Sequence, residues 1–177
     1  MPPASFDTST GMPIRERGEI AAHAPDAARS EATRLFCIEA ARSLTDDKCE
    51  YVLVLDLRGR SQVTDFFVIA SGTSDRQIRS AADHVADMAS SRGISLYRSN
   101  LDESRANWIV LDFVDVVVHA MLPETRRYYD LELLWGDAPR VAWQRPGDAP
   151  SEARPSLPGE RNRAGLTERD VLPRADG

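Results

Sequence analysis

The segment Gly72-Thr73-Ser74 is the first place where this chain could do chemistry, because it joins an apolar run, Phe66 to Ala70, to a helical pattern. In a strand-turn-helix arrangement, backbone amides at the start of the helix can surround a phosphate group. Nucleotidyl transfer would also require paired carboxylates on a strand, which hold metal ions that bridge the phosphates. The turn therefore raises the question of whether such a pair exists.

The acidic residues do not supply that pair. Asp130 and Glu132 are separated by one residue, but they fall in a helical pattern, and Asp83 and Asp87 lie on the solvated face of the helix after the turn. Capping explains the turn more simply, because Ser74 and Gln77 have capping-box spacing and can each satisfy an open backbone N–H. A nucleotidyltransferase-like enzyme or nucleotide-binding module that uses Gly72 to Gln77 is kept as the alternative.

Metal and thiol chemistry is also not indicated. The chain has three histidines and two cysteines, and their positions do not match a zinc site: His23, His84, His119, Cys37 and Cys49. The two cysteines are expected to act as small buried hydrophobes, and nothing in the sequence supports a disulfide between them. His119 lies among valines in a strand pattern and is expected to be a core histidine with satisfied hydrogen bonds rather than a ligand. No metal and no cofactor are expected.

Charge narrows the class of partner. The chain has 177 residues and a net charge of -6, and the range 44–143 holds 16 acidic and 11 basic residues, a balance of -5. This balance argues against direct binding to a nucleic-acid backbone, which needs a basic surface. It suits a basic protein partner instead. Because no apolar run approaches the roughly 18 residues of a membrane helix, we expect a cytoplasmic protein without a membrane contact.

Three regions are expected. Residues 1–25 should be a disordered N-terminal extension, 26–143 one α/β domain, and 144–177 a disordered tail rich in proline and arginine. The domain should open with a helix capped by Asp26, whose apolar stripe consists of Ala32, Leu35, Phe36, Ala40 and Leu44. A strand covered on both faces should follow at Tyr51–Leu57.

Further elements follow the Ser74 cap. The helix should run to Arg92, and a short strand is expected at Ile94–Arg98. The runs Asn107–Phe113 and Asp115–Leu122 should pair as a tight hairpin. The segment Glu124–Trp135 should form one or two helical turns, with a local ion pair between Arg127 and Glu132.

Six segments resemble the ribosomal silencing factor family, also called RsfS or Iojap. The resemblance covers about residues 35 to 140, with these segments in the family's order and at its spacing: Leu53-Val-Leu-Asp56, Thr64-Asp-Phe-Phe-Val-Ile-Ala-Ser-Gly-Thr-Ser74, Ala82-Asp-His84, Trp108-Ile-Val-Leu-Asp112, Asp115-Val-Val-Val-His119 and Arg127-Tyr-Tyr-Asp-Leu-Glu-Leu-Leu-Trp135. One departure is Leu101-Asp102, which stands where the family usually has Glu-Gly.

The resemblance implies a fold and a function. The expected fold is a mixed β-sheet flanked by helices, with a topology like that of nucleotidyltransferases. The implied role is not enzymatic: the protein would bind ribosomal protein fourteen on the large ribosomal subunit and block joining of the small subunit, which lowers translation when nutrients are scarce. The sequence leaves the oligomeric state open, with a homodimer as one alternative, because strand edges and the C-terminal aromatic cluster could pair.

Trp108 is the expected anchor for the partner, since tryptophan is enriched among the residues that dominate interface energies. Asp102 and Glu103 lie close before it, and Asp112, Asp115 and Tyr129 complete the expected binding set. The competing interpretations are that Trp108 covers a sheet edge and that the two later aspartates serve turn geometry. A second set of residues is expected to shape the fold: Asp65, Gly72, Thr73, Ser74, Gln77, His119 and Trp135.

Overall fold

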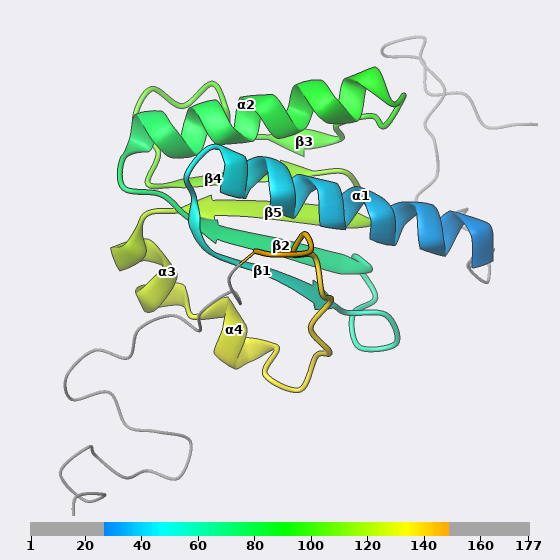
Figure 1. The fold of residues 1–177 in the computed structure, drawn as a ribbon. Coiled ribbons are helices and arrows are strands. Elements are labelled where there is room, and N and C mark those ends of the chain that lie inside the picture. The colour runs from blue at the N-terminus through cyan, green and yellow to red at the C-terminus, as the bar shows by residue number, and fades with distance from the viewer. Residues whose placement is uncertain (1–26, 149–177) are drawn as a thin grey trace, which may run out of the picture.

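The computed structural model describes residues 27–148, which form a five-stranded sheet and four helices (Figure 1). Their order along the chain is α1 (Ala27–Asp46), β1 (Glu50–Asp56), β2 (Phe66–Ser71), α2 (Asp75–Ser91), β3 (Arg98–Ser99), β4 (Trp108–Asp112), β5 (Val116–Met121), α3 (Pro123–Tyr129) and α4 (Leu131–Leu134). The expected cap at Asp26 and the expected extension 1–25 lie outside the described residues, as does most of the expected tail 144–177.

The sheet has the strand order β1-β2-β5-β4-β3. Strands β2 and β5 run parallel, and every other neighbouring pair is antiparallel. The parallel pair arises because α2 and the β4 hairpin strand lie between β2 and β5 in the chain. The prediction of a mixed sheet flanked by helices is confirmed, and so is the β4–β5 hairpin.

One face of the sheet is sealed by the two long helices, α1 and α2, which lie side by side across it in Figure 1. We call it the helix-covered face. Side chains point alternately to opposite faces along a strand, so every second residue lies here. The strand residues that build it are Val52, Val54, Phe66, Val68, Ala70, Ile109, Leu111, Val116, Val118 and Ala120. None of them is more than 3% exposed.

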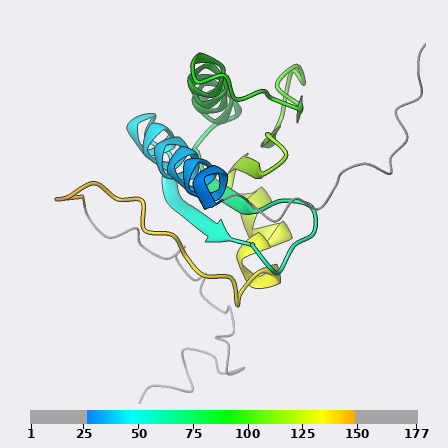
Figure 2. The same ribbon diagram turned by 90° about the vertical axis from the view of Figure 1, so that its right-hand side faces the viewer.

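The opposite face carries rings, and we call it the aromatic face. It is formed by Phe67, Trp108 and His119 on the strands, with Tyr129 from α3 and Trp135, the residue that follows α4. Figure 2 shows α3 and α4 on the side of the sheet away from α1 and α2. Strand β1 therefore has packed side chains on both faces, as its sequence predicts.

The outer edge of β1 is occupied by a later part of the chain. The N–H of Asp56 donates to the carbonyl of Pro139, and the N–H of Val141 donates to the carbonyl of Val54, each at 2.9 Å. The buried Trp143 adds a hydrogen bond from its indole N–H to the carbonyl of Val52, at 3.2 Å. This edge is thereby protected from pairing with another strand.

Two local predictions were wrong. In α1, Ala32 is exposed and Leu35 is 50% exposed, because Phe36 and Cys37 occupy the inward positions instead. The strand expected at Ile94–Arg98 is reduced to Arg98–Ser99. The reason is that Ile94 closes the end of α2: its N–H donates to the carbonyl of Ala89 at 2.9 Å.

Gly93 allows this closure. Its φ of +72° lies in the left-handed region, which glycine adopts without steric cost.

Near the C-terminal end of the described residues, the Arg145 guanidinium binds both carboxylate oxygens of Asp46, at 2.7 and 2.8 Å.

Candidate partner-binding face

A row of three rings crosses the middle of the aromatic face. Phe67 in β2, His119 in β5 and Trp108 in β4 lie on neighbouring strands, with ring centroids 4.7 Å apart for the first pair and 5.6 Å for the second. The strand register explains this row, because Phe67 is opposite Val117 and Trp108 is opposite Met121. His119 lies midway between those two positions on β5, so its ring contacts both diagonal neighbours.

The two short helices extend this row at its ends. Tyr129 of α3 contacts Trp108 with centroids 4.7 Å apart, and Tyr128 contacts Tyr129 at 5.0 Å. At the other end, Trp135 meets Phe67 edge-to-face at 6.1 Å. The helices thus brace the row at both ends.

The aromatic face is only half covered. Trp108 and Phe67 are half-buried, and Tyr129 is 52% exposed. The adjoining α3–α4 surface adds the exposed side chains of Tyr128, Leu133 and Leu134. The rings of Trp108, Tyr129 and Tyr128 contact one another in sequence, and exposed apolar groups that adjoin one another are the kind of surface expected at an interaction site.

His119 is the polar member of the row. The indole N–H of Trp108 donates to His119 Nδ1 at 3.2 Å, and indole can only donate, so the imidazole proton resides on Nε2. Nε2 is buried and has no hydrogen-bond partner among the described residues. Burial lowers the pKa of His119 to about 4. The expectation of a core histidine is confirmed by the burial of His119, but the expectation that its hydrogen bonds are satisfied is wrong for Nε2 among the described residues.

A buried ion pair fixes α3 and α4 against the sheet. Arg126 Nε lies 2.6 Å from Glu132 Oε1, and Arg126 Nη1 donates to the hydroxyl of Ser71 at 3.0 Å. The predicted pair of Arg127 with Glu132 is wrong, because Arg126 is the arginine that faces inward; Arg127 approaches Glu124 at 3.8 Å. Two adjacent arginines cannot be told apart without knowing which side of α3 faces the sheet.

The loop that carries Asp102 and Glu103, which we call the acidic loop, is held to the backbone of Trp108 by hydrogen bonds. The Asn100 side chain donates to the carbonyl of Trp108 at 2.9 Å and accepts the N–H of Val110 at 2.8 Å. Arg79 of α2 donates to the carbonyls of Leu101 and Glu103. Asp102 and Glu103 are exposed on this loop, which Arg79 holds against α2 and whose Leu101 packs on the core of the helix-covered face. Neither Asn100 nor Arg79 stood out in the sequence.

Asp112 and Asp115 lie elsewhere. Trp108 begins β4 and Asp112 ends it, so the two aspartates are at the opposite end of the strand from the anchor. Asp112 accepts the N–H of Val114 at 2.8 Å, which is turn chemistry, and Asp115 is paired with Arg29 at 2.7 Å. The structure therefore brings the rings of Trp108 and Tyr129 together and ties the acidic loop, through Asn100, to the backbone at the start of β4. It leaves Asp112 and Asp115 at the other end of that strand.

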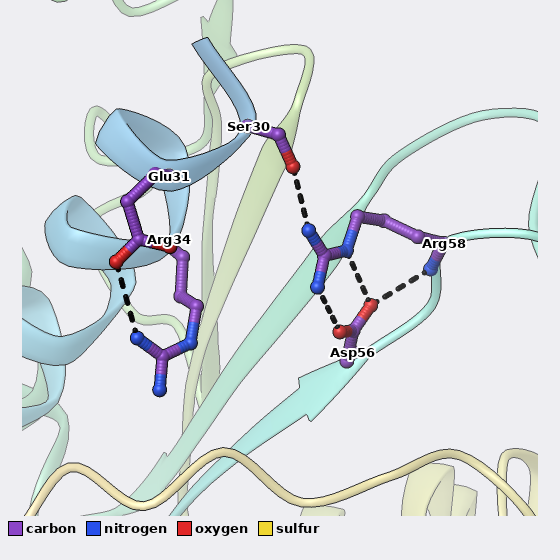
Figure 3. Close-up of polar contacts among 5 residues, drawn as sticks. All are labelled: Ser30, Glu31, Arg34, Asp56 and Arg58. Atoms are coloured by element: carbon purple, nitrogen blue, oxygen red, sulfur yellow. Dashed lines mark hydrogen bonds and ion pairs between the residues drawn. The ribbon is translucent and has the colours of Figure 1, made fainter. Parts of the chain in front are cut away.

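Other charges near that end are also paired within the chain. Figure 3 shows Arg58 held by Asp56 at the end of β1 and by Ser30 of α1, with nitrogen–oxygen distances of 2.9 Å for Nε–Oδ1 and 2.6 Å to the serine hydroxyl. Asp65 supports the same corner, since its N–H donates to the carbonyl of Asp115 at 2.9 Å. Burial and the nearby Asp115 raise the pKa of the Asp65 carboxyl.

The turn before α2 is filled by its own side chains. Ser74 accepts the N–H of Gln77 at 3.2 Å, so the predicted cap is confirmed. The Gln77 amide oxygen accepts the N–H of Thr73 at 2.8 Å, while its amide nitrogen donates to the carbonyl of Asp47 at 3.0 Å. A Cβ on Gly72 would lie 2.6 Å from Ile78 Cγ2, so close packing accounts for this glycine.

Residues 27–148 contain no group of three or more His, Cys, Asp or Glu side chains arranged to hold a metal ion. Cys37 and Cys49 are buried free thiols, as expected of small hydrophobes. Over the same part of the chain, no helix combines the length and apolar character needed to cross a membrane.

The fold and this face define a small α/β protein in which one side of a mixed sheet presents an open surface of rings. The family model described as "Ribosomal silencing factor during starvation" matches residues 29–168. The chain belongs to the ribosomal silencing factor family. The family predicted from the sequence is thereby confirmed.

Individual relatives agree with this assignment. The chain is 43% identical over 101 residues to the ribosomal silencing factor RsfS of Bacillus subtilis, an alignment that covers 56% of this chain and 84% of the relative. It is 32% identical over 98 residues to "Mitochondrial assembly of ribosomal large subunit protein 1" of Mus musculus, covering 52% and 41%. A crystal structure of a protein from Chromobacterium violaceum superposes with a TM-score of 0.54 at 35% identity, covering 60% of this chain and 85% of that one.

Proposed function

We propose that this protein binds the large ribosomal subunit through ribosomal protein fourteen and prevents the small subunit from joining by occupying the same surface. Translation would then fall under nutrient limitation and in stationary phase. Membership of the ribosomal silencing factor family supports the ribosomal role. The observation that carries the choice of surface is the half-open aromatic face, where Trp108 and Tyr129 pack together at 4.7 Å and Tyr129 is 52% exposed.

Trp108 is suited to be the anchor of this interface. Its ring is already held between His119 and Tyr129, so binding costs little side-chain entropy. Its N–H is used by His119, and the ring surface is therefore what Trp108 offers to a partner. A ring surface binds apolar side chains and also arginine or lysine, by cation–π attraction.

The carboxylates have unequal parts in the proposal. Asp102 and Glu103, which are exposed on the loop that Asn100 ties to the start of β4, would steer a basic partner toward the anchor. Asp112 and Asp115 would form an outer contact at the far end of β4. Asp115 would have to exchange its Arg29 partner for a cation of the ribosome to take part.

The proposed mechanism is binding alone, without catalysis or a cofactor, in the cytoplasm. The alternative of a nucleotide-binding or nucleotidyltransferase-like site at Gly72–Gln77 gains no support from the described residues. Gln77 already occupies the N–H of Thr73, and Gly72 is explained by its contact with Ile78.

A homodimer is a further part of the proposal. The outer edge of β1 is occupied by residues 139–141, so we propose that a second copy would use the exposed leucines of α4, Leu133 and Leu134. Sedimentation velocity of the purified protein tests this proposal. A dimer that dissociates in the double variant Leu133→Ser and Leu134→Ser is the expected result, and a wild-type monomer at micromolar concentration would contradict it.

The experiment that tests the proposed function is binding to purified large ribosomal subunits, measured by co-sedimentation. We expect the wild type to bind and Trp108→Ala to lose at least about 2 kcal/mol of binding free energy, roughly 30-fold in affinity. Tyr97→Ala is the matched control, because Tyr97 is a 68% exposed aromatic residue outside the aromatic row. A wild type that does not bind the large subunit would overturn the proposal.

A further inference from the structure

His119 is a costly residue for its position. It is 6% exposed at the centre of an aromatic row, with Nε2 buried and unpartnered among the described residues. A buried polar group without a partner is unfavourable, and an apolar side chain of similar size would avoid this penalty. His119 makes one side-chain hydrogen bond among the described residues, to the indole of Trp108. A role that offsets the penalty of burying Nε2 is therefore to be sought in this bond.

We propose that His119 is a positioning residue for the binding face: as a neutral imidazole protonated on Nε2, it accepts the indole N–H of Trp108 and holds the ring in its binding orientation. The part of this inference that concerns affinity rests on the proposed function. The part that concerns the ring is a property of the free protein.

The ring geometry supports a hydrogen-bonded lock rather than stacking. Trp108 is tilted by 50° to His119 and by 49° to Tyr129. Aromatic pairs by themselves prefer offset-parallel or edge-to-face arrangements, and neither tilt is close to these. The orientation is therefore set by the directional contact, which points the indole N–H at Nδ1 over 3.2 Å.

Nothing else among the described contacts of Trp108 would hold the ring in this orientation. Tyr129, its other ring neighbour, contacts one side of the ring at 4.7 Å by packing alone and is itself 52% exposed. Without an acceptor at His119, the indole N–H would turn toward water, since a buried donor without a partner is unfavourable. Trp108 would then sample several rotamers, and binding would have to select one of them.

The tautomer is as important as the residue. A proton on Nδ1, in either the other tautomer or the imidazolium, would face the indole N–H with a second donor and abolish the bond. The burial that keeps Nε2 away from water also disfavours the charged form. Only the neutral Nε2–H form is compatible with the contact.

The first arm of the test is nitrogen-15 NMR of the full-length free protein at pH 7. We expect His119 to be the Nε2–H tautomer, with a scalar coupling across the hydrogen bond between Trp108 Nε1 and His119 Nδ1. In His119→Leu the indole N–H of Trp108 should shift and exchange faster with water. A wild-type imidazolium, an Nδ1–H tautomer, or an indole signal that His119→Leu leaves unchanged would overturn the proposal.

The second arm measures affinity for the large ribosomal subunit in a double-mutant cycle. His119→Leu should weaken binding by about tenfold or more, whereas His119→Asn, whose side-chain oxygen keeps an acceptor near the Nδ1 position, should stay within about threefold of the wild type. In a Trp108→Phe background, which lacks the N–H, His119→Leu should change affinity by less than about threefold. An equal loss in both backgrounds would overturn the positioning role.

The two arms separate this inference from the proposed function. If the wild type binds no large subunit, the proposed function fails, and the NMR arm alone decides whether His119 orients Trp108. If His119→Leu does not fold, the wild-type tautomer and coupling decide that question. If the wild type binds and His119→Leu binds equally well, the proposed function stands and the positioning role fails.

Discussion

The two faces of the sheet are built from the same strands but are covered to different extents by helices. On the helix-covered face, α1 and α2 leave none of the ten apolar strand side chains that build it more than 3% exposed. On the aromatic face, α3 and α4 have only seven and four residues and leave Phe67 and Trp108 half-buried. The strand pattern is apolar on both sides, so the length of the covering helices separates a sealed core from the half-covered face that we propose as the binding surface.

The largest expected effect comes from breaking the helix-covered face. Phe66→Ala removes a ring that is 0% exposed and should lower the free energy of unfolding by about 3–5 kcal/mol. Trp108→Ala should cost clearly less stability, because its ring is half-buried, while it costs more affinity. Urea unfolding of both variants measures the difference. Equal losses of stability would show that Trp108 is a core residue and that the two faces do not differ as described.

The pH dependence of stability sharpens the comparison at His119. Burial lowers its folded pKa to about 4 from 6.5, so the unfolded chain takes up the proton at a higher pH than the folded chain does. The stability that neutral His119 contributes is complete above pH 6.5 and is lost as the pH falls toward 4, about 3 kcal/mol in all. Urea unfolding between pH 7 and pH 5 should show a steeper loss for the wild type than for His119→Leu, and parallel curves would contradict this.

His84 provides a control of opposite sign. Its pKa is raised by the hydrogen bond and charge of Asp47, which lies 2.8 Å from the ring. A histidine of this kind contributes stability below its unfolded pKa and loses that contribution as the pH rises through its folded pKa. Compared with the wild type, His84→Ala should therefore lose stability more steeply as the pH falls. His119→Leu should lose stability less steeply than the wild type.

A smaller effect is expected at the edge of the aromatic face. Tyr129→Ala removes the ring that packs on Trp108 and should weaken large-subunit binding by about 1 kcal/mol, the scale of one aromatic pair. Tyr128→Ala is the comparison, because Tyr128 is 83% exposed and contacts Tyr129 rather than Trp108. Co-sedimentation titrations of both variants distinguish them. A larger loss for Tyr128→Ala would move the binding surface away from Trp108.

The smallest expected effect is electrostatic. Binding to the large subunit should weaken with added salt through a slower association rate, because exposed carboxylates steer a basic partner and salt screens them. The double variant Asp102→Asn and Glu103→Gln should reduce this salt dependence, whereas Asp112→Asn should leave it nearly unchanged. Stopped-flow association at two salt concentrations measures the rates. A salt-independent wild-type rate would remove the steering role of the loop.

The sequence predicted the elements best where its patterns were local. Periodicity and capping identified β2, α2 and the β4–β5 hairpin, because a period of two or 3.6 residues and a cap at Ser74 act over short distances. It was wrong at Ile94–Arg98, where apolar residues suited a strand but Ile94 was needed to close α2. The sequence allowed two local roles for Ile94, in a strand or at the end of α2, and the tertiary structure decides between them.

The site was only partly predictable. Trp108 and Tyr129 were chosen separately by residue type and resemblance, and their contact depends on α3 folding back over β4, which no local pattern encodes. His119 was expected in the core, but its bond to Trp108 follows from a cross-strand register that the sequence does not show. Asn100 was missed for a similar reason, since its side chain acts on the backbone of a strand eight residues away.

The most direct test of the central claim is a subunit-joining assay. Purified large and small ribosomal subunits are mixed under joining conditions with wild-type protein, Trp108→Ala or Tyr97→Ala, and the particles are separated by sedimentation. We predict that the wild type and Tyr97→Ala travel with the large subunit and suppress the joined particle, whereas Trp108→Ala does neither. Joining that proceeds normally with wild-type protein bound to the large subunit, or suppression by folded Trp108→Ala at wild-type strength, would contradict the account.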